Sequence, residues 1–174
     1  MIRQFHHTLV TQGPSWLRFP AQLTPFEVKR RVLLSTLEHV FKEALEDGDF
    51  EFLTDRWLRL SVTDMQLTAY ISFDDDSESL KIAEQCDVPD ICFEATANDL
   101  VLIAARFEDP DTLFFQRRLK IEGDTELGLE VKNLIDSVDW AVLPKPLTAM
   151  LTQLARFIET GLAPTTEPLH ADQN

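Results

Sequence analysis

Few residues of this chain have both the type and the spacing that chemistry requires. His6 and His7 are adjacent, and adjacent helical positions point in different directions, so they do not form a metal-binding pair. Cys86 and Cys92 lack the Cys-x-x-Cys partners of a zinc or iron–sulfur site. His39 lies next to an apolar helical stripe, which favours a structural histidine over a general base. We therefore expect no metal ligand and two ordinary thiols.

Nucleotide-binding and nucleophilic motifs are also missing from the sequence. The glycines do not form a phosphate-binding loop. No Gly-x-Ser-x-Gly elbow is present. The acidic runs 46–49 and 74–76 fall in predicted turns without the spacing of a calcium loop. We expect no catalytic residue and no cofactor, and thus a protein that is not an enzyme.

One pair of arginines admits a binding role. Arg117 and Arg118 follow Asp109-Pro110-Asp111, where Asp109 is expected to cap a short helix that starts at Pro110. A guanidinium at the mouth of a pocket holds a lipid phosphate or a carboxylate. The alternative is a surface salt bridge, which we favour because acidic partners are abundant.

Charge is unevenly distributed along the 174 residues. Residues 1–42 hold six basic and two acidic residues and therefore carry a charge of +4. The net charge of the chain is −14, so the remaining residues carry −18. Such an acidic body repels phosphate backbones and argues against nucleic-acid binding. The basic front segment either approaches an anionic lipid surface or an acidic partner, or only neutralises the body.

The apolar residues are numerous but are never gathered into a membrane span. They make up 44% of the chain, which suffices for a sizeable core, without a run of eighteen. The N-terminus lacks the apolar centre of a secretory signal. We therefore expect a cytoplasmic protein with reduced thiols. Phe occurs twelve times and Tyr once, which indicates apolar burial or apolar ligand contact; periodicity alone favours burial.

Alternation and helical periodicity define the expected elements. Strands are expected at 57–62, 66–73, 80–82, 91–95 and 118–122. Helices are expected from Thr24 to Asp47, from Asn98 to Ala104, from 124 or 125 to Val138, and from Leu147 to Gly161. Thr24 and Asn98 are the expected caps, and Gly13-Pro14 is expected to break the first segment.

This order predicts an α+β fold with two layers, in which amphipathic helices cover a five-stranded, mainly antiparallel sheet. We divide the chain into an amphipathic, basic N-terminal segment (1–23), a domain (24–162) and a disordered tail (163–174). Trp16-Leu17-Arg18-Phe19 admits two interpretations: contact with a membrane interface, or packing as a clasp over the domain's own apolar surface.

Residues 109–133 resemble the sterol carrier protein type two family of small lipid-binding domains. The resemblance is carried by a strand exit and the helix after it, with Leu119, Ile121, Gly123 and Asp124, followed by Leu127 and Leu134. The run Asp109 to Arg118 is similar to one branch of that family, the bacterial ubiquinone biosynthesis accessory factors. The resemblance extends over nearly the whole chain and implies helices that stand off the sheet around an apolar tunnel.

The resemblance implies a set of lipid-binding side chains on the inner face and a head-group site at Arg117 and Arg118. The implied lipid-binding residues are Phe41, Leu60, Ile71, Phe73, Phe93, Ala104, Phe114, Phe115, Ile121, Leu127 and Val131.

The function that the resemblance implies is a non-enzymatic accessory role in oxygen-independent, anaerobic ubiquinone biosynthesis. The protein would hold an isoprenoid quinone precursor or related lipid for UbiU/UbiV-like iron–sulfur hydroxylase partners, with peripheral membrane contact and no nucleic acid. Two alternatives stay open: a general lipid or sterol carrier in membrane traffic, and a ligand-free interaction module.

Overall fold

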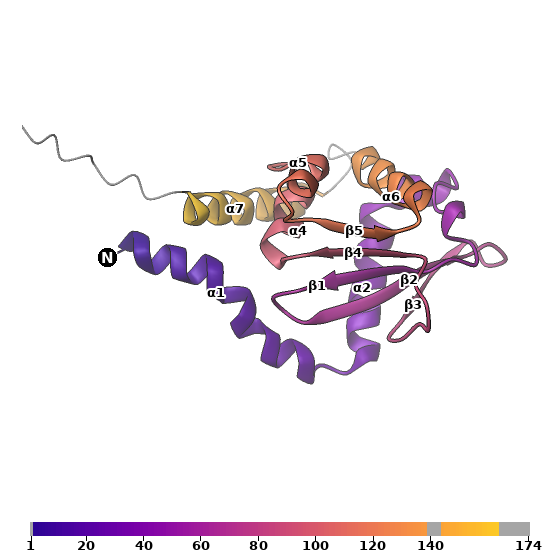
Figure 1. Ribbon diagram of the computed structural model, residues 1–174, viewed down its shortest axis with the longest axis horizontal. Coiled ribbons are helices and arrows are strands. Elements are labelled where there is room, and N and C mark those ends of the chain that lie inside the picture. The colour runs from indigo at the N-terminus through magenta and orange to yellow at the C-terminus, as the bar shows by residue number, and fades with distance from the viewer. Residues whose placement is uncertain (1, 139–143, 164–174) are drawn as a thin grey trace, which may run out of the picture.

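A computed structural model describes residues 2–138 and 144–163 and shows a five-stranded sheet with helices (Figure 1). The strand order is β3-β2-β1-β4-β5. Three neighbouring pairs are antiparallel, while the central pair, β1 and β4, is parallel. The predicted α+β class is confirmed, and the sheet is mixed. The strands are β1 (Leu58–Val62), β2 (Leu67–Asp74), β3 (Ser79–Ala83), β4 (Ile91–Ala95) and β5 (Lys120–Gly123).

Helices account for most of the remaining described residues. They are α1 (Ile2–Leu23), α2 (Phe26–Val40), α3 (Lys42–Glu46), α4 (Ala97–Ala104), α5 (Pro110–Phe115), α6 (Thr125–Ser137) and α7 (Lys145–Leu162), with a 3₁₀ turn, η1 (Glu51–Leu53). The apolar face of the sheet follows the pleat: Leu58 pairs with Ile71 and Ile91, and Leu60 with Phe93. The expected tail falls outside the described residues, apart from Ala163.

A second apolar cluster joins α1, α4 and α7, beside the left end of the sheet in Figure 1. Val10, Leu102 and Ile158 are buried in it. Gly161 allows the close approach, since a Cβ there would lie 2.5 Å from Val10 Cγ2. Next to it, His7 Nδ1 lies 2.8 Å from the Gly161 carbonyl. His7 thus has a structural partner at the end of α7.

The expected break at Gly13-Pro14 is wrong, because α1 continues through Pro14 and Pro20. Pro14 has no N–H for the carbonyl of Val10, one turn earlier. Asn98 replaces it: its side-chain Nδ2 donates to Val10 O at 2.8 Å. Gly13 has no Cβ to clash with the proline ring, which removes the usual penalty on the preceding residue. Tertiary packing therefore keeps this helix whole.

Two expected caps are also wrong. Thr96 caps α4, accepting from the Asp99 N–H, whereas Asn98 lies inside the helix. Thr24 Oγ1 donates back to Pro20 O, and Pro25 precedes α2. The cap expected at Asp109 is confirmed, with Pro110 in the first position of α5. Of the two alternatives for the start of the following helix, Asp124 and Thr125, the cap of α6 is Asp124.

Two further differences concern residues 16–47. The expected single helix up to Asp47 is interrupted at Phe41 (φ −107°, ψ 27°), which separates α2 from α3. Trp16, Leu17 and Phe19 on α1 are exposed, so these side chains do not pack as a clasp over the domain.

Candidate functional site

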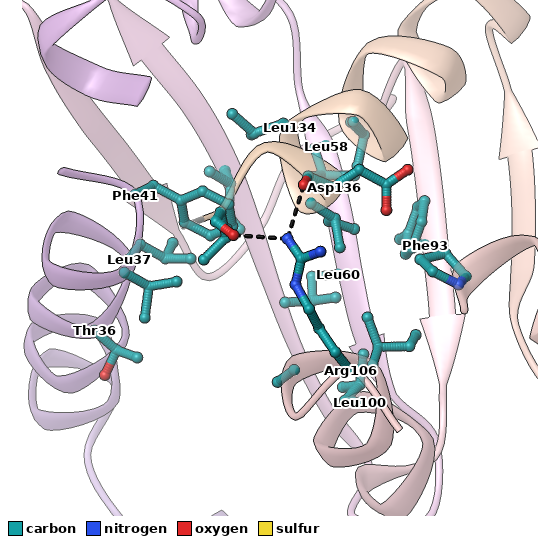
Figure 2. A pocket seen from close by; sticks show the side chains of 18 of the residues that line it. Thr36, Leu37, Phe41, Leu58, Leu60, Phe93, Leu100, Arg106, Leu134 and Asp136 are labelled. Carbon is teal, nitrogen blue, oxygen red and sulfur yellow. Dashed lines mark hydrogen bonds between the residues drawn. The ribbon is translucent and has the colours of Figure 1, made fainter. Parts of the chain in front are cut away.

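An apolar cavity of about 740 Å³ lies between the sheet and the helices. Its floor comes from β1, β2 and β4, through Leu58, Leu60, Ile71 and Phe93. Figure 2 shows Leu37 and Phe41 on one side, and Leu134 and Leu100 on others. This volume lies within the range of about 300–1,000 Å³ that is usual for small-molecule sites. The side chains of residues 2–138 and 144–163 therefore leave part of the interior unfilled.

The break at Phe41 helps to form this cavity. Phe41 ends the regular part of α2, and its ring meets that of Phe50 edge-on at a centroid distance of 5.7 Å. Phe50 stacks in turn on Phe73 at 6.4 Å. These three rings form an apolar end wall, of which Phe41 and Phe50 reach the cavity. Such rings give large apolar area without polar atoms that need partners.

The structure places about half of the predicted lipid-binding side chains on the cavity wall. Those that line it are Phe41, Leu60, Ile71, Phe93, Ala104 and Val131. Those that do not are Phe73, Phe114, Phe115, Ile121 and Leu127. Phe73 and Leu127 are buried in the core behind the wall, and Ile121 packs against it. For Phe73, Ile121 and Leu127 the inner face was predicted correctly, but a sequence pattern cannot separate core from cavity.

The paired phenylalanines of α5 lie on the outside. Phe115 is 81% exposed, and Phe114 is also exposed. The short helix turns Pro110 and Leu113 inward instead, and Leu113 is fully buried. In a helix, residues directly after a buried position point elsewhere. The apolar pair is therefore a surface feature and not part of the cavity wall.

Neither predicted head-group arginine reaches the cavity. Arg118 Nε donates to Asp99 Oδ1 at 3.0 Å, and Arg118 Nη1 lies 3.5 Å from Glu108. Asp99 is only 4% exposed, so this ion pair joins α4 to the start of β5 in a largely buried place. Arg117 is exposed, with a left-handed backbone (φ 62°). The salt-bridge interpretation describes Arg118 in the structure.

Sequence reasoning missed the arginine that does line the cavity, Arg106. Its Nη2 donates to the carbonyls of Asp136 (2.8 Å) and Val138 (2.6 Å), the dashed lines in Figure 2. Arg106 follows α4 with a left-handed backbone, φ 53°. A helix-ending arginine looks like an ordinary surface residue in sequence, so no pattern pointed to it.

The helix α6 forms one wall of the cavity, and two ion pairs hold it in place, one at its start and one along its length. The hydrogen bond from Lys132 to Asp111 of α5 raises the pKa of the Lys132 ammonium. At the helix start, the backbone N–H groups of Leu127 and Glu126, with Arg56 nearby, lower the pKa of the Asp124 carboxyl. Both shifts favour the charged forms, which stabilise the position of α6.

Within residues 2–138 and 144–163, no cluster of three or more histidine, cysteine or acidic side chains is arranged to hold a metal ion. No helix in these ranges has the length and apolarity to cross a bilayer.

The SCP-2 sterol transfer family matches residues 34–136, which hold the five strands, the second half of α2, α3 to α5 and nearly all of α6. The chain belongs to the SCP-2 sterol transfer family. Curated relatives include the ubiquinone biosynthesis accessory factor UbiT of Escherichia coli strain K12 and that of strain O157:H7. Each is 48% identical over 169 residues, covering 96% of this chain and 95% of the relative.

A solved SCP-2 structure agrees with the fold. The protein described as "UbiJ-SCP2 Ubiquinone synthesis protein" superposes with a TM-score of 0.50 at 19% identity, covering 64% of this chain and 97% of that one. At this identity, the match establishes the fold alone. In the present chain, α1, the first turns of α2 and all of α7 lie outside the residues 34–136 that match the family.

Proposed function

We propose that this protein is a non-enzymatic accessory factor of ubiquinone biosynthesis that holds an isoprenoid quinone precursor, or a related lipid, in the cavity. It would present the head group to hydroxylases of the UbiU/UbiV iron–sulfur kind in an oxygen-independent pathway in the cytoplasm. The observation that carries the proposal is the unfilled apolar cavity under the helices of this SCP-2 chain.

Energetics support an apolar tail as the occupant. Burial of about ten methylenes gains about 8 kcal/mol before ordering costs. A preformed cavity lowers those costs, because the wall does not need to be assembled on binding. The likeness to UbiT over nearly the whole chain supports a ubiquinone-pathway role over general lipid traffic.

The ligand is tested by mass spectrometry of lipids that co-purify with the protein from cells grown without oxygen. Prenylated phenols or quinones should be enriched over the membrane lipid composition. A bound population that mirrors bulk phospholipid would instead support a general carrier. Absence of any lipid, together with no binding in titration, would support a ligand-free module and contradict the proposal.

The cavity is tested by occlusion. Leu60→Trp adds a large ring to the cavity floor, and Ala104→Trp adds one where α4 borders the cavity. Both should lower the amount of co-purified lipid severalfold while the circular dichroism spectrum is retained. Ala149→Trp, on the exposed side of α7 and away from the cavity wall, is the matched control. Undiminished lipid in both occluded variants would contradict binding in this cavity.

A further inference from the structure

The cavity opens to solvent where its lining residues are exposed, and its polar lining residues are found there. Among the described lining residues, those on the exposed surface are Thr36, Ala104, Arg106, Asp109 and Asp136, and half-buried Glu108 lies beside them. They come from α2, the end of α4, the turn before α5 and the end of α6. The remainder of the described lining is apolar. A ligand whose tail fills the cavity therefore places its head group among these side chains.

The charges at this opening are unequal. Arg106 is its single cation among the described lining residues, against three carboxylates: Glu108, Asp109 and Asp136. Like charges close together disfavour an additional anion, and a phosphate monoester carries between one and two negative charges near neutral pH. The opening is thus poorly suited to a phosphorylated head group.

Arg106 is held in place with donors to spare. Its backbone N–H bonds to Ile103 O at 2.9 Å, which ends α4, and its side chain reaches across to α6. The two bonds to Asp136 O and Val138 O use the two N–H groups of Nη2. Nη1 and Nε have no hydrogen-bond acceptor among the described residues, so three N–H groups remain for a ligand oxygen.

The carboxylates differ in how much they are already engaged. Asp109 Oδ1 accepts the N–H groups of Asp111 and Thr112 as the cap of α5. Glu108 lies 3.5 Å from Arg118. The carboxylate of Asp136 accepts no hydrogen bond from the described residues, while the backbone carbonyl of the same residue accepts from Arg106 (Figure 2). Asp136 is therefore the acceptor that a ligand hydroxyl can use.

We propose that this opening selects an uncharged, oxygen-bearing head group, such as a phenol or alcohol on a prenyl chain, against its phosphate ester. Arg106 donates to a head-group oxygen, and Asp136 accepts from its hydroxyl. The inference rests on the proposed function, because it takes the cavity as the site of the tail, and it assigns Arg106 as the residue that determines head-group specificity.

The test compares two ligands with one tail. Geranylgeraniol and geranylgeranyl monophosphate differ only in the head group, and each is titrated against an apolar fluorescent dye bound in the cavity. The alcohol should displace the dye at a concentration at least about tenfold lower, a ratio equivalent to about 1.4 kcal/mol. Asp136→Asn with Glu108→Gln should reduce this preference, since the repulsion is removed.

Arg106→Gln separates a head-group role from a structural one. This substitution should lower the affinity for the alcohol by about tenfold, the effect of losing one hydrogen bond to a charged group. Binding of a hydrocarbon of the same length should not change, provided that the cavity is intact. Arg117→Gln, at an exposed arginine away from the cavity, is the matched control. Equal loss for the alcohol and the hydrocarbon would overturn the assignment of Arg106.

The outcomes separate the two proposals. If neither prenyl ligand displaces the dye, the proposed function fails and the inference fails with it. If alcohol and phosphate bind equally, or the phosphate binds more tightly, the head-group inference is overturned while the cavity remains a lipid site.

Discussion

At the scale of single residues, the pair Arg118–Asp99 shows how much depends on a partner that the sequence does not name. Asp99 Oδ1 accepts from Arg118, while Thr96 Oγ1 donates to Oδ2 at 2.8 Å. The carboxylate lies in the interior, so loss of the arginine leaves a charge that water cannot solvate. This contact links α4 to β5.

We expect Arg118→Gln to lower the free energy of unfolding by about 3–5 kcal/mol, the usual cost of breaking a buried pair. The matched change at the exposed neighbour, Arg117→Gln, should stay within about 0.5 kcal/mol. Urea denaturation of both variants measures the difference. Equal, small effects would show that the pair contributes no more than a surface ion pair.

Gly123 is the second residue whose backbone position restricts which amino acid can occupy it. Its φ is +122°, and an added Cβ would lie 2.3 Å from Asp90 O and 2.9 Å from Ile91 Cα. Gly123→Ala should therefore destabilise the fold by at least about 2 kcal/mol. Gly128→Ala, inside α6, is the control, because its Cβ would meet Ile121 and Ile91 at 3.4 Å, and stability should change by no more than about 1 kcal/mol in either direction. Thermal unfolding compares the two, and similar midpoints would contradict the steric argument.

Sequence reasoning at this scale succeeded where the signal is local. Asp109 and Asp124 were identified as caps because an aspartate before a helix satisfies N–H groups two and three residues later. It failed for Arg106, and for Arg118 it favoured a salt bridge without naming the partner, Asp99. Acidic residues occur throughout the chain, so the partner of a given arginine is fixed only by tertiary structure.

At the scale of elements, α1 depends on a contact with α4 that is far away in sequence. The side chain of Asn98 takes the place of the N–H that Pro14 lacks. Asn98→Ala should therefore cost about 1–3 kcal/mol, because the Val10 carbonyl is left without a partner in a buried cluster.

Pro14→Ala provides the decisive comparison for this contact. An alanine restores the backbone donor, so Asn98→Ala should cost less in the Pro14→Ala background than in the unmodified protein. A double-mutant cycle measured by chemical denaturation gives the coupling energy. A coupling energy near zero would contradict the idea that the Asn98 side chain takes the place of the backbone N–H that Pro14 lacks.

The start of α6 predicts a response to pH. The pKa of Asp124 is lowered in the folded protein, first by the N–H groups of Leu127 and Glu126 and then by Arg56. Its contribution to stability is present above the ordinary aspartate pKa of about 3.9 and is lost as pH falls through the lowered folded value. Asp124→Asn should flatten the loss of stability between about pH 5 and pH 2. Urea denaturation across this range checks it, and an unchanged slope would contradict it.

Most elements were predicted from periodicity, since strands and amphipathic helices repeat their pattern over several residues. All five strands lie within one or two residues of their expected positions. The failures occur where tertiary contacts override local signals, at Pro14 and at Phe41. About half of the residues predicted to bind lipid line the cavity, because periodicity reports which side of an element faces inward and not where packing stops short.

At the scale of the whole molecule, an unfilled centre means that a ligand contributes to stability. At one hundred times its dissociation constant, a ligand that binds only the folded state adds about 2.7 kcal/mol. For a chain of this size, this corresponds to a rise in Tm of about 5–10 °C. Geranylgeraniol should produce this rise, and Leu60→Trp should abolish it while Ala149→Trp should not. No shift at saturation would contradict binding to the folded state.

The parallel pairing of β1 with β4 has a consequence for the newly made chain. β1, β2 and β3 are joined by short turns and can pair as soon as they leave the ribosome, whereas the partner on the other side of β1 begins only at Ile91. Until then, the future centre of the sheet is an open edge with unpaired backbone groups, the feature that promotes aggregation. Synthesis that stalls between residues 74 and 90 should therefore yield chains that depend on chaperones, while release of the full-length chain should not.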